Sequence, residues 1–162
     1  MGRWRPPAEK SSPYITPEGY RALEKELAAL WVKRKGVNEA LSAAAAEGDR
    51  SENAEYIYRK KQQGEIDRRI RYLQKRTPDL KLVDKVGSTD KVFFGAWVEL
   101  EVDGEQFEYR IVGSDETDAK LNFISVDSPL AKALLGKPLD TEIKVMIGGV
   151  EKLYTILAIR YK

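Results

Sequence analysis

The sequence of 162 residues contains no cysteine and no histidine. Without cysteine, the chain can form neither a disulfide nor a thiolate metal site. Without histidine, it lacks the commonest general base and the commonest zinc ligand of proteins. Any chemistry of this chain must therefore use carboxylates, lysines, hydroxyls or groups that a partner supplies.

Long apolar runs are also missing, since none approaches the roughly 20 residues that a membrane-spanning helix needs. The first twelve residues are polar and include Arg3, Arg5, Pro6 and Pro7. They lack the apolar segment of a signal peptide. We therefore expect a cytoplasmic protein with no membrane partner.

Charge is abundant and unevenly distributed. Charged residues make up 33% of the chain, above the roughly 25% typical of globular proteins. Residues 1–80 hold 17 Lys and Arg against 12 Asp and Glu, whereas residues 81–162 hold 11 against 14. This asymmetry indicates a nucleic-acid partner for the first half, with solvated helix surface as the alternative.

The first half has the period of two long helices. Thr16-Pro17-Glu18 is typical of a helix start, with Thr16 as N-cap and Pro17 in the first helical position. Gly48 is the predicted stop, and a second helix is predicted to end near Thr77-Pro78. The apolar residues recur mostly at three- and four-residue intervals: Tyr20, Leu23, Leu27, Leu30, Val37, Leu41 and Ala44, then Tyr56, Ile66, Ile70 and Leu73. This spacing predicts an antiparallel coiled-coil hairpin over residues 14–79, preceded by a flexible arm at 1–13.

From Leu80 the period changes to that of strands. Ala96 to Val102 alternates, and Asp103-Gly104 is a hairpin turn signal. Further strands are predicted at 106–112, 122–126, 142–147 and 150–160, with a short helix opened by Ser128-Pro129. Residues 80–162 therefore form a small, mostly antiparallel sheet domain with one helix, and the fold class is α+β.

Two carboxylates, Asp49 and Glu52, lie in the turn between the predicted helices. Their spacing matches a capping box, in which Asp49 caps the second helix and Glu52 reaches back. It also suits Mg²⁺, which prefers oxygen ligands and is often held by one or two carboxylates together with substrate phosphates and water. Because two exposed carboxylates bind magnesium weakly, a functional pair needs a partner that supplies the other ligands.

The second helix carries a basic stripe. Residues 59–76 contain eight Lys and Arg but only two Asp and Glu. The stripe includes Arg59, Lys60, Lys61, Arg68 and Arg69. A stripe of this kind can follow a phosphate backbone, so these five residues are candidate RNA-binding residues. An ordinary solvated helix face is the alternative.

The tip segment Gly48 to Tyr56, Gly-Asp-Arg-Ser-Glu-Asn-Ala-Glu-Tyr, resembles the Gre transcript-cleavage factors of bacteria. The segments that begin at Ile15, Glu65, Val92, Arg110 and Ile124 resemble the same family, so the likeness runs from about Ile15 to about Tyr161. The tip and the Phe-Phe-Gly-Ala-Trp segment are closer to the GreB branch, whereas Gln62-Gln63-Gly64 is similar to the GreA branch.

This resemblance implies an FKBP-like C-terminal domain that docks on the rim of the secondary channel of RNA polymerase, while the hairpin enters the channel. It implies that Asp49 and Glu52 help to hold a Mg²⁺ ion shared with the polymerase and to position water for hydrolysis of backtracked nascent RNA. Asp127, Ser128 and Pro129 correspond to the polymerase-binding positions. The protein would be a monomeric accessory of the polymerase and would not itself be an enzyme.

Two alternatives remain at this point. One is a channel-binding inhibitor of polymerase that does not cleave RNA, although such family members carry a denser acidic tip. The other is a coiled-coil binding or chaperone module, for which the tip acids would be dispensable.

Overall fold

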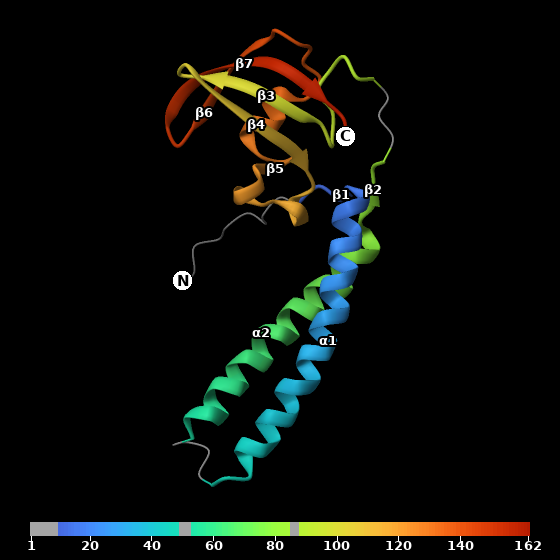
Figure 1. Ribbon diagram of the computed structural model, residues 1–162, viewed down its shortest axis with the longest axis vertical. Helices are drawn as coiled ribbons and strands as arrows, with labels where there is room; N and C mark the ends of the chain where they lie inside the picture. Colours follow the sequence, from blue (N-terminus) through green and yellow to red (C-terminus); the bar gives the residue numbers. More distant parts are fainter. Residues whose placement is uncertain (1–9, 49–52, 85–87) are drawn as a thin grey trace, which may run out of the picture. The chain divides into compact units, whose positions relative to one another are not determined.

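The computed structural model (Figure 1) describes residues 10–48, 53–84 and 88–162. The chain divides into two compact units: one comprises residues 20–80, and the other combines 81–162 with the segment that ends at Gly19. The first is helical and the second contains the sheet, which confirms the α+β class. In the part of the chain that is described, no helix is both long and apolar enough to span a bilayer.

The helical unit is an antiparallel pair, α1 (Pro17–Ala45) and α2 (Ala54–Arg76), as Figure 1 shows. Thr16 caps α1 as predicted, because its Oγ1 accepts a hydrogen bond from the Gly19 amide at 3.1 Å. The helix ends three residues before Gly48, slightly earlier than predicted. At roughly 1.5 Å per residue, α1 is about 43 Å long.

The seam between the helices is apolar and flanked by ion pairs. Val37 of α1 packs with Ile66 and Ile70 of α2, and Leu27 and Leu30 extend this cluster. Two pairs cross the seam: Arg34 Nε to Asp67 Oδ1 at 2.7 Å, and Arg69 to both carboxylate oxygens of Glu26 at 2.6 and 2.9 Å. Because pairs this exposed contribute at most about 1 kcal/mol each, the apolar contacts contribute most of the stability.

Gly36 lies inside α1 without a structural need for glycine. A Cβ built there meets no atom within 4 Å, and the residue does not have a positive φ. We therefore expect Gly36→Ala to stabilise the hairpin by about 1 kcal/mol, because alanine has the higher helix propensity. Thermal unfolding should show a rise of about 2–4 °C. A lower melting temperature would show that Gly36 has a role that the helix geometry does not explain.

The second unit is built on a five-stranded sheet with strand order β5-β4-β3-β7-β6. The strands are β3 (Trp97–Val102), β4 (Glu105–Val112), β5 (Phe123–Ser125), β6 (Glu142–Ile147) and β7 (Val150–Arg160). Asp103-Gly104 and Gly148-Gly149 have positive φ throughout, as two-residue hairpin turns require. Both predicted hairpins are therefore confirmed.

The sheet is mostly antiparallel, as the sequence predicted, and it contains one parallel pairing. Three of its pairings are antiparallel, but β5 runs parallel to β4, with Arg110 opposite Phe123. Between these strands the chain makes two short 3₁₀ turns, Ser114–Glu116 and Ala119–Leu121. This connection carries the chain back, so that β5 enters the sheet in the same direction as β4.

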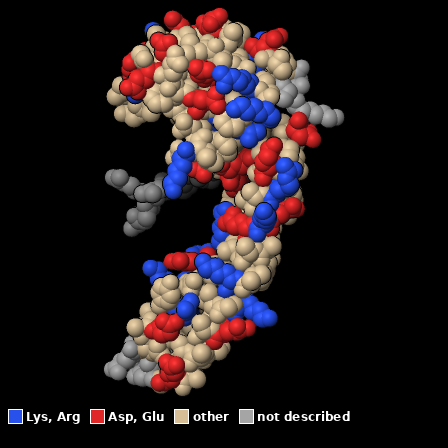
Figure 2. All heavy atoms as spheres, in the orientation of Figure 1, with Lys and Arg blue, Asp and Glu red and all other residues tan. Residues whose placement is uncertain are grey.

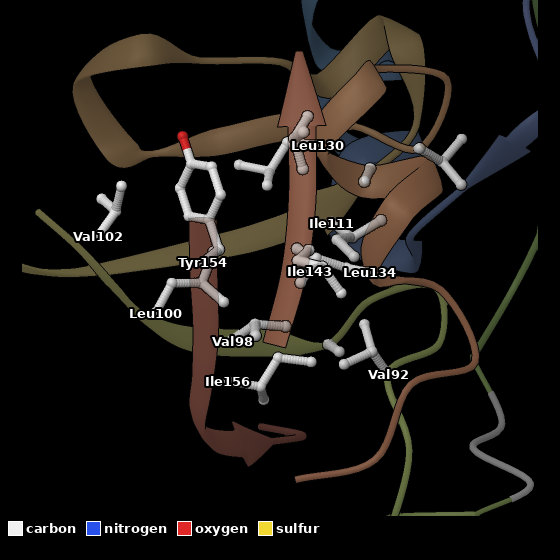
Figure 3. Close-up of a cluster of buried hydrophobic side chains, with 14 residues drawn as sticks. Val92, Val98, Leu100, Val102, Ile111, Leu130, Leu134, Ile143, Tyr154 and Ile156 are labelled. Atoms are coloured by element: carbon white, nitrogen blue, oxygen red, sulfur yellow. The ribbon is translucent and has the colours of Figure 1, made fainter. Parts of the chain in front are cut away.

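The core lies between the sheet and the short helix α3 (Pro129–Leu134), as Figure 3 shows. Val98 and Leu100 of β3 and Ile156 of β7 are fully buried, and Leu134 of α3 packs with them. Ser128 Oγ accepts a hydrogen bond from the Ala131 amide at 3.2 Å, so the predicted cap of this helix is confirmed.

Two short strands, β1 (Tyr14–Ile15) and β2 (Lys81–Leu82), pair in parallel. Thr16, which follows β1 and precedes α1, is only 2% exposed. Its amide donates to Glu116 Oε2 at 3.0 Å, its hydroxyl donates to Glu116 Oε1, and the Gly113 amide donates to Oε2 at 2.7 Å. One carboxylate thus holds the residue before α1 to the segment after β4, within the sheet unit.

Candidate functional site

The predicted catalytic pair, Asp49 and Glu52, lies outside the described residues, but the two ends of the tip segment are described. Both ends are held by Asn53. Its Oδ1 accepts a hydrogen bond from the Tyr56 amide at 3.0 Å, and its Nδ2 donates to the Ala44 carbonyl oxygen at 2.7 Å. One side chain therefore caps the start of α2 and holds it to the last turn of α1.

This arrangement bears on the capping-box interpretation of the tip. The N-cap of α2 is Asn53, four residues after Asp49. The N-cap position that the spacing suggested for Asp49 is therefore occupied by Asn53. The roles predicted for Asp49 and Glu52 in metal binding and catalysis stay predictions.

The donor set of the tip suits magnesium in chemistry but is incomplete. Asp49 and Glu52 would supply carboxylate oxygens, which are the ligands that magnesium prefers. Among the described residues, no three Asp, Glu, His or Cys side chains come together to complete a metal site. Since two carboxylates alone bind magnesium weakly, an ion held by the tip needs further ligands.

The candidate RNA-binding residues of α2 have different surroundings. Lys60, Lys61 and Arg68 are exposed, and Lys60 Nζ lies 3.4 Å from Gln63 Oε1. Arg59 pairs with Glu55 at 2.8 Å and lies over the Tyr58 ring. Figure 2 shows one face of the hairpin, on which Lys and Arg side chains lie among Asp and Glu side chains.

Arg69 has a structural partner. Its guanidinium binds both oxygens of Glu26 across the hairpin and lies 5.4 Å from the centre of the Tyr72 ring. A bidentate pair of this kind fixes the guanidinium in one orientation. Arg69 is therefore less available for a phosphate than Lys60, Lys61 or Arg68.

The candidate docking residues Asp127, Ser128 and Pro129 lie at the start of α3. Pro129 is exposed, while Asp127 is half-buried and accepts hydrogen bonds from Ser12. The Ser12 amide donates to Asp127 Oδ2 at 2.8 Å and the Ser12 hydroxyl donates to Oδ1. Residue 12, assigned to a flexible arm from the sequence, is thus fixed to the candidate docking edge.

Three residues with clear roles were not predicted: Asn53, Glu116 and Ser12. Asn53 carried a local signal, because an Asn directly before a helix is a good N-cap. Glu116 and Ser12 act on residues more than 90 positions away in the chain. No local pattern in the sequence could have identified them.

The chain thus combines a paired-helix unit with a small sheet unit, and Asp49 and Glu52 lie in sequence between the two helices. The family models "Transcription elongation factor, N-terminal" and "Transcription elongation factor, GreA/GreB, C-term" match residues 13–81 and 87–161. The chain belongs to the GreA/GreB family of transcription elongation factors.

Curated relatives are similar in sequence to this chain along nearly its whole length. The chain is 56% identical to "Transcription elongation factor GreB" of Xanthomonas axonopodis pv. citri (strain 306), with 99% of this chain and 98% of the relative covered. It is 54% identical to the protein of the same name from Pseudomonas aeruginosa PAO1, with the same coverage. This chain is thus similar to the GreB branch, as the tip segment indicated.

Solved structures give a more distant likeness. The GreA factor homolog Gfh1 of Thermus thermophilus is 22% identical, with a TM-score of 0.42 and coverage of 91% of this chain and 97% of that one. A GreA/GreB elongation factor from Nitrosomonas europaea is also 22% identical, with a TM-score of 0.41 and coverage of 93% and 100%.

Proposed function

We propose that this protein binds RNA polymerase, inserts its hairpin into the secondary channel and stimulates cleavage of backtracked nascent RNA. The observation that carries the proposal is the hairpin whose turn bears Asp49 and Glu52, in a chain of the GreA/GreB family. Helices about 43 and 35 Å long are suited to carry a short turn into a partner's channel.

The tip carboxylates would act together with the active centre of the polymerase. Asp49 and Glu52 would supply two oxygen ligands to a magnesium ion or orient the water that attacks the RNA. A magnesium ion bound there would supply electrostatic stabilisation of the attacking and leaving oxygens. Because the remaining ligands come from the polymerase and the RNA, the protein would assist the reaction without being an enzyme on its own.

The exposed bases of α2 would contact the extruded RNA. Lys60 and Lys61 follow the tip by about two helical turns, so they would lie near the RNA segment that leaves the active centre. Lys61 makes no ion pair among the described residues, and a phosphate would have little competition there. Arg59 and Arg68 would add positive charge to the same RNA-facing surface.

The proposal can be tested with stalled, backtracked transcription complexes, purified and incubated with and without the protein. We expect the protein to shorten the RNA from its 3′ end and to release short fragments. Restored elongation after nucleotides are added should accompany the cleavage. Polymerase binding without cleavage would indicate the channel-binding inhibitor, and the absence of both polymerase binding and cleavage would indicate a binding or chaperone module. Cleavage that persists after removal of both tip acids would show that these acids do not act in the reaction.

The docking residues give a separate prediction. We expect Asp127→Asn to weaken polymerase binding by roughly tenfold, the loss of more than about 1 kcal/mol that marks the few dominant residues of an interface. Higher protein concentration should restore full cleavage, since the tip is unchanged. Asp118→Asn is a matched control, because Asp118 also accepts a backbone hydrogen bond at the start of a short helix. The measurement is competition with the wild type for polymerase binding. Equal affinities would show that Asp127 is not part of the docking site.

A further inference from the structure

Trp31 is an exposed aromatic residue in the middle of α1, and the proposed function does not use it. Its relative exposure is 45%, whereas Leu27 and Leu30 of the same helix pack into the seam. Its neighbour Val32 is 75% exposed, so both side chains lie outside the seam. A single exposed apolar side chain is ordinary on a protein surface, and it is the surroundings of Trp31 that set this residue apart.

Trp31 stands between two surface hollows of the helical unit. One, of about 550 Å³, is lined along α1 by Lys35, Asn38, Glu39 and Ser42. The other, of about 320 Å³, is lined by Asp67, Ile70, Arg71 and Gln74 of α2. Trp31 and Arg34 belong to both linings and so form the ridge between them. Both hollows are shallow and open to solvent, so they suit an extended ligand that lies along the surface.

The charges around the ridge favour an anionic ligand. Arg34 is held by Asp67 at 2.7 Å, and its guanidinium carbon lies 5.9 Å from the centre of the Trp31 ring. Lys35 lines one hollow and makes no ion pair among the described residues, and the exposed Arg71 lines the other. Asp67 is already neutralised by Arg34, which leaves Glu39 as the one unpaired acid in the two linings.

The same face continues to the basic residues near the tip. Asn38, in the lining next to Trp31, accepts a hydrogen bond from Gln63 at 2.7 Å, and Gln63 in turn accepts one from Lys60 at 3.4 Å. Trp31 and Asn38 are seven residues apart, or about 10 Å along the helix. An extended strand that passes Lys60 on this face can therefore also pass Trp31.

We propose that Trp31 is a stacking platform for a base of single-stranded RNA, with Lys35 and Arg71 beside it as phosphate contacts. An aromatic ring among cations is the arrangement with which proteins hold single strands irrespective of sequence. The inference takes its ligand, the extruded RNA, from the proposed function. It adds that the RNA contact extends from α2 onto α1, further from the tip than the basic stripe alone would place it.

Binding of free RNA to the full-length protein tests this inference independently of cleavage. The probe is a short, fluorescently labelled single-stranded RNA, whose anisotropy is measured at two salt concentrations. We expect Trp31→Ala to weaken binding by roughly tenfold and Trp31→Phe by no more than about threefold, because phenylalanine retains a stacking face. Lys35→Ala should lower the slope of log affinity against log salt by about 0.7, the value for one phosphate contact with a single strand.

The control variant is Val32→Ala, which removes an exposed apolar side chain next to Trp31 and should leave the affinity unchanged. An abasic oligonucleotide of the same length should bind wild type and Trp31→Ala equally, since it has phosphates but no bases. Equal affinity of wild type and Trp31→Ala for normal RNA would overturn the proposal, as would the absence of wild-type binding at low salt. A Trp31→Ala variant that keeps RNA binding but loses polymerase binding would assign Trp31 to the wall of the channel.

A cleavage assay separates this inference from the proposed function. If the wild type fails to stimulate cleavage, the proposed function is wrong. If the wild type cleaves and Trp31→Ala matches Val32→Ala on both deeply and shallowly backtracked complexes, the stacking platform alone is wrong. We expect Trp31→Ala to lose about tenfold on the deep complexes only, where enough RNA is extruded to reach α1.

Discussion

Replacement of Asp49 or Glu52 by alanine should lower stimulated RNA cleavage by on the order of 10- to 100-fold, with little change in stability or polymerase binding. This is the range expected when a group that holds or orients a catalytic ion is removed. Because the N-cap of α2 is Asn53, removal of Asp49 leaves the helix start intact. Cleavage rates at saturating protein concentration, together with a thermal melt of each variant, are the measurements.

Two variants in the same segment sharpen the test. Arg50→Ala is the control for a change of side chain between the two acids. Asn53→Asp keeps the oxygen that accepts from Tyr56 but removes the amide that donates to Ala44, so it releases one end of the segment. We expect Asn53→Asp to bind polymerase normally and to cleave more slowly than wild type. If both acid variants cleave at the wild-type rate, the catalytic assignment is wrong; if both unfold, the acids are structural.

Replacement of Glu116 by alanine should lower the free energy of unfolding by about 3 kcal/mol. The Glu116 carboxylate accepts hydrogen bonds from the amides of Thr16 and Gly113 and from the Thr16 hydroxyl. Each buried donor left without an acceptor costs roughly 1–3 kcal/mol. Urea unfolding of the full chain would measure the loss. The exposed Glu105 in the same unit is the control, and Glu105→Ala should change stability by less than about 0.5 kcal/mol.

A double-mutant cycle with Gly19 identifies the cause of that loss. A Cβ on Gly19 would overlap the Glu116 carboxylate, so Gly19→Ala should destabilise the wild type. In the Glu116→Ala background the space is free, and the same change should cost little. We expect a coupling energy of at least about 1 kcal/mol. Additive effects of the two substitutions would show that Glu116 does not fill the position next to Gly19.

The regular elements of this protein were predictable because their signals are local. Thr16 and Ser128 are small hydroxyl residues directly before a proline, and both cap helices in the structure. Asp103-Gly104 and the pair of glycines before Val150 form tight turns with positive φ, a conformation that few other residues adopt easily. Such signals act within four residues, so they can be recognised before the rest of the chain is known.

The direction of β5 was not predictable in this way. Alternation of apolar and polar residues shows that a segment forms a strand, but it is the same for parallel and antiparallel neighbours. The 3₁₀ turns between β4 and β5 decide the direction, together with the Asp118 side chain, which accepts a hydrogen bond from the Lys120 amide. The predicted site residues Asp49 and Glu52 stay predictions, since they lie outside the described residues.

The sequence by itself determined the helical pair, the sheet strands, the acidic turn and the family, because periodicity, caps and a continuous motif are local properties. The tertiary structure alone decided which charged side chains are held and which are available. Arg69 and Lys60 are both bases of one stripe, but Glu26, 43 residues away, holds Arg69, whereas Lys60 is exposed. Partners so distant in sequence meet only when the chain folds, and for that reason Arg69, Glu116 and Ser12 acquired their roles from the structure.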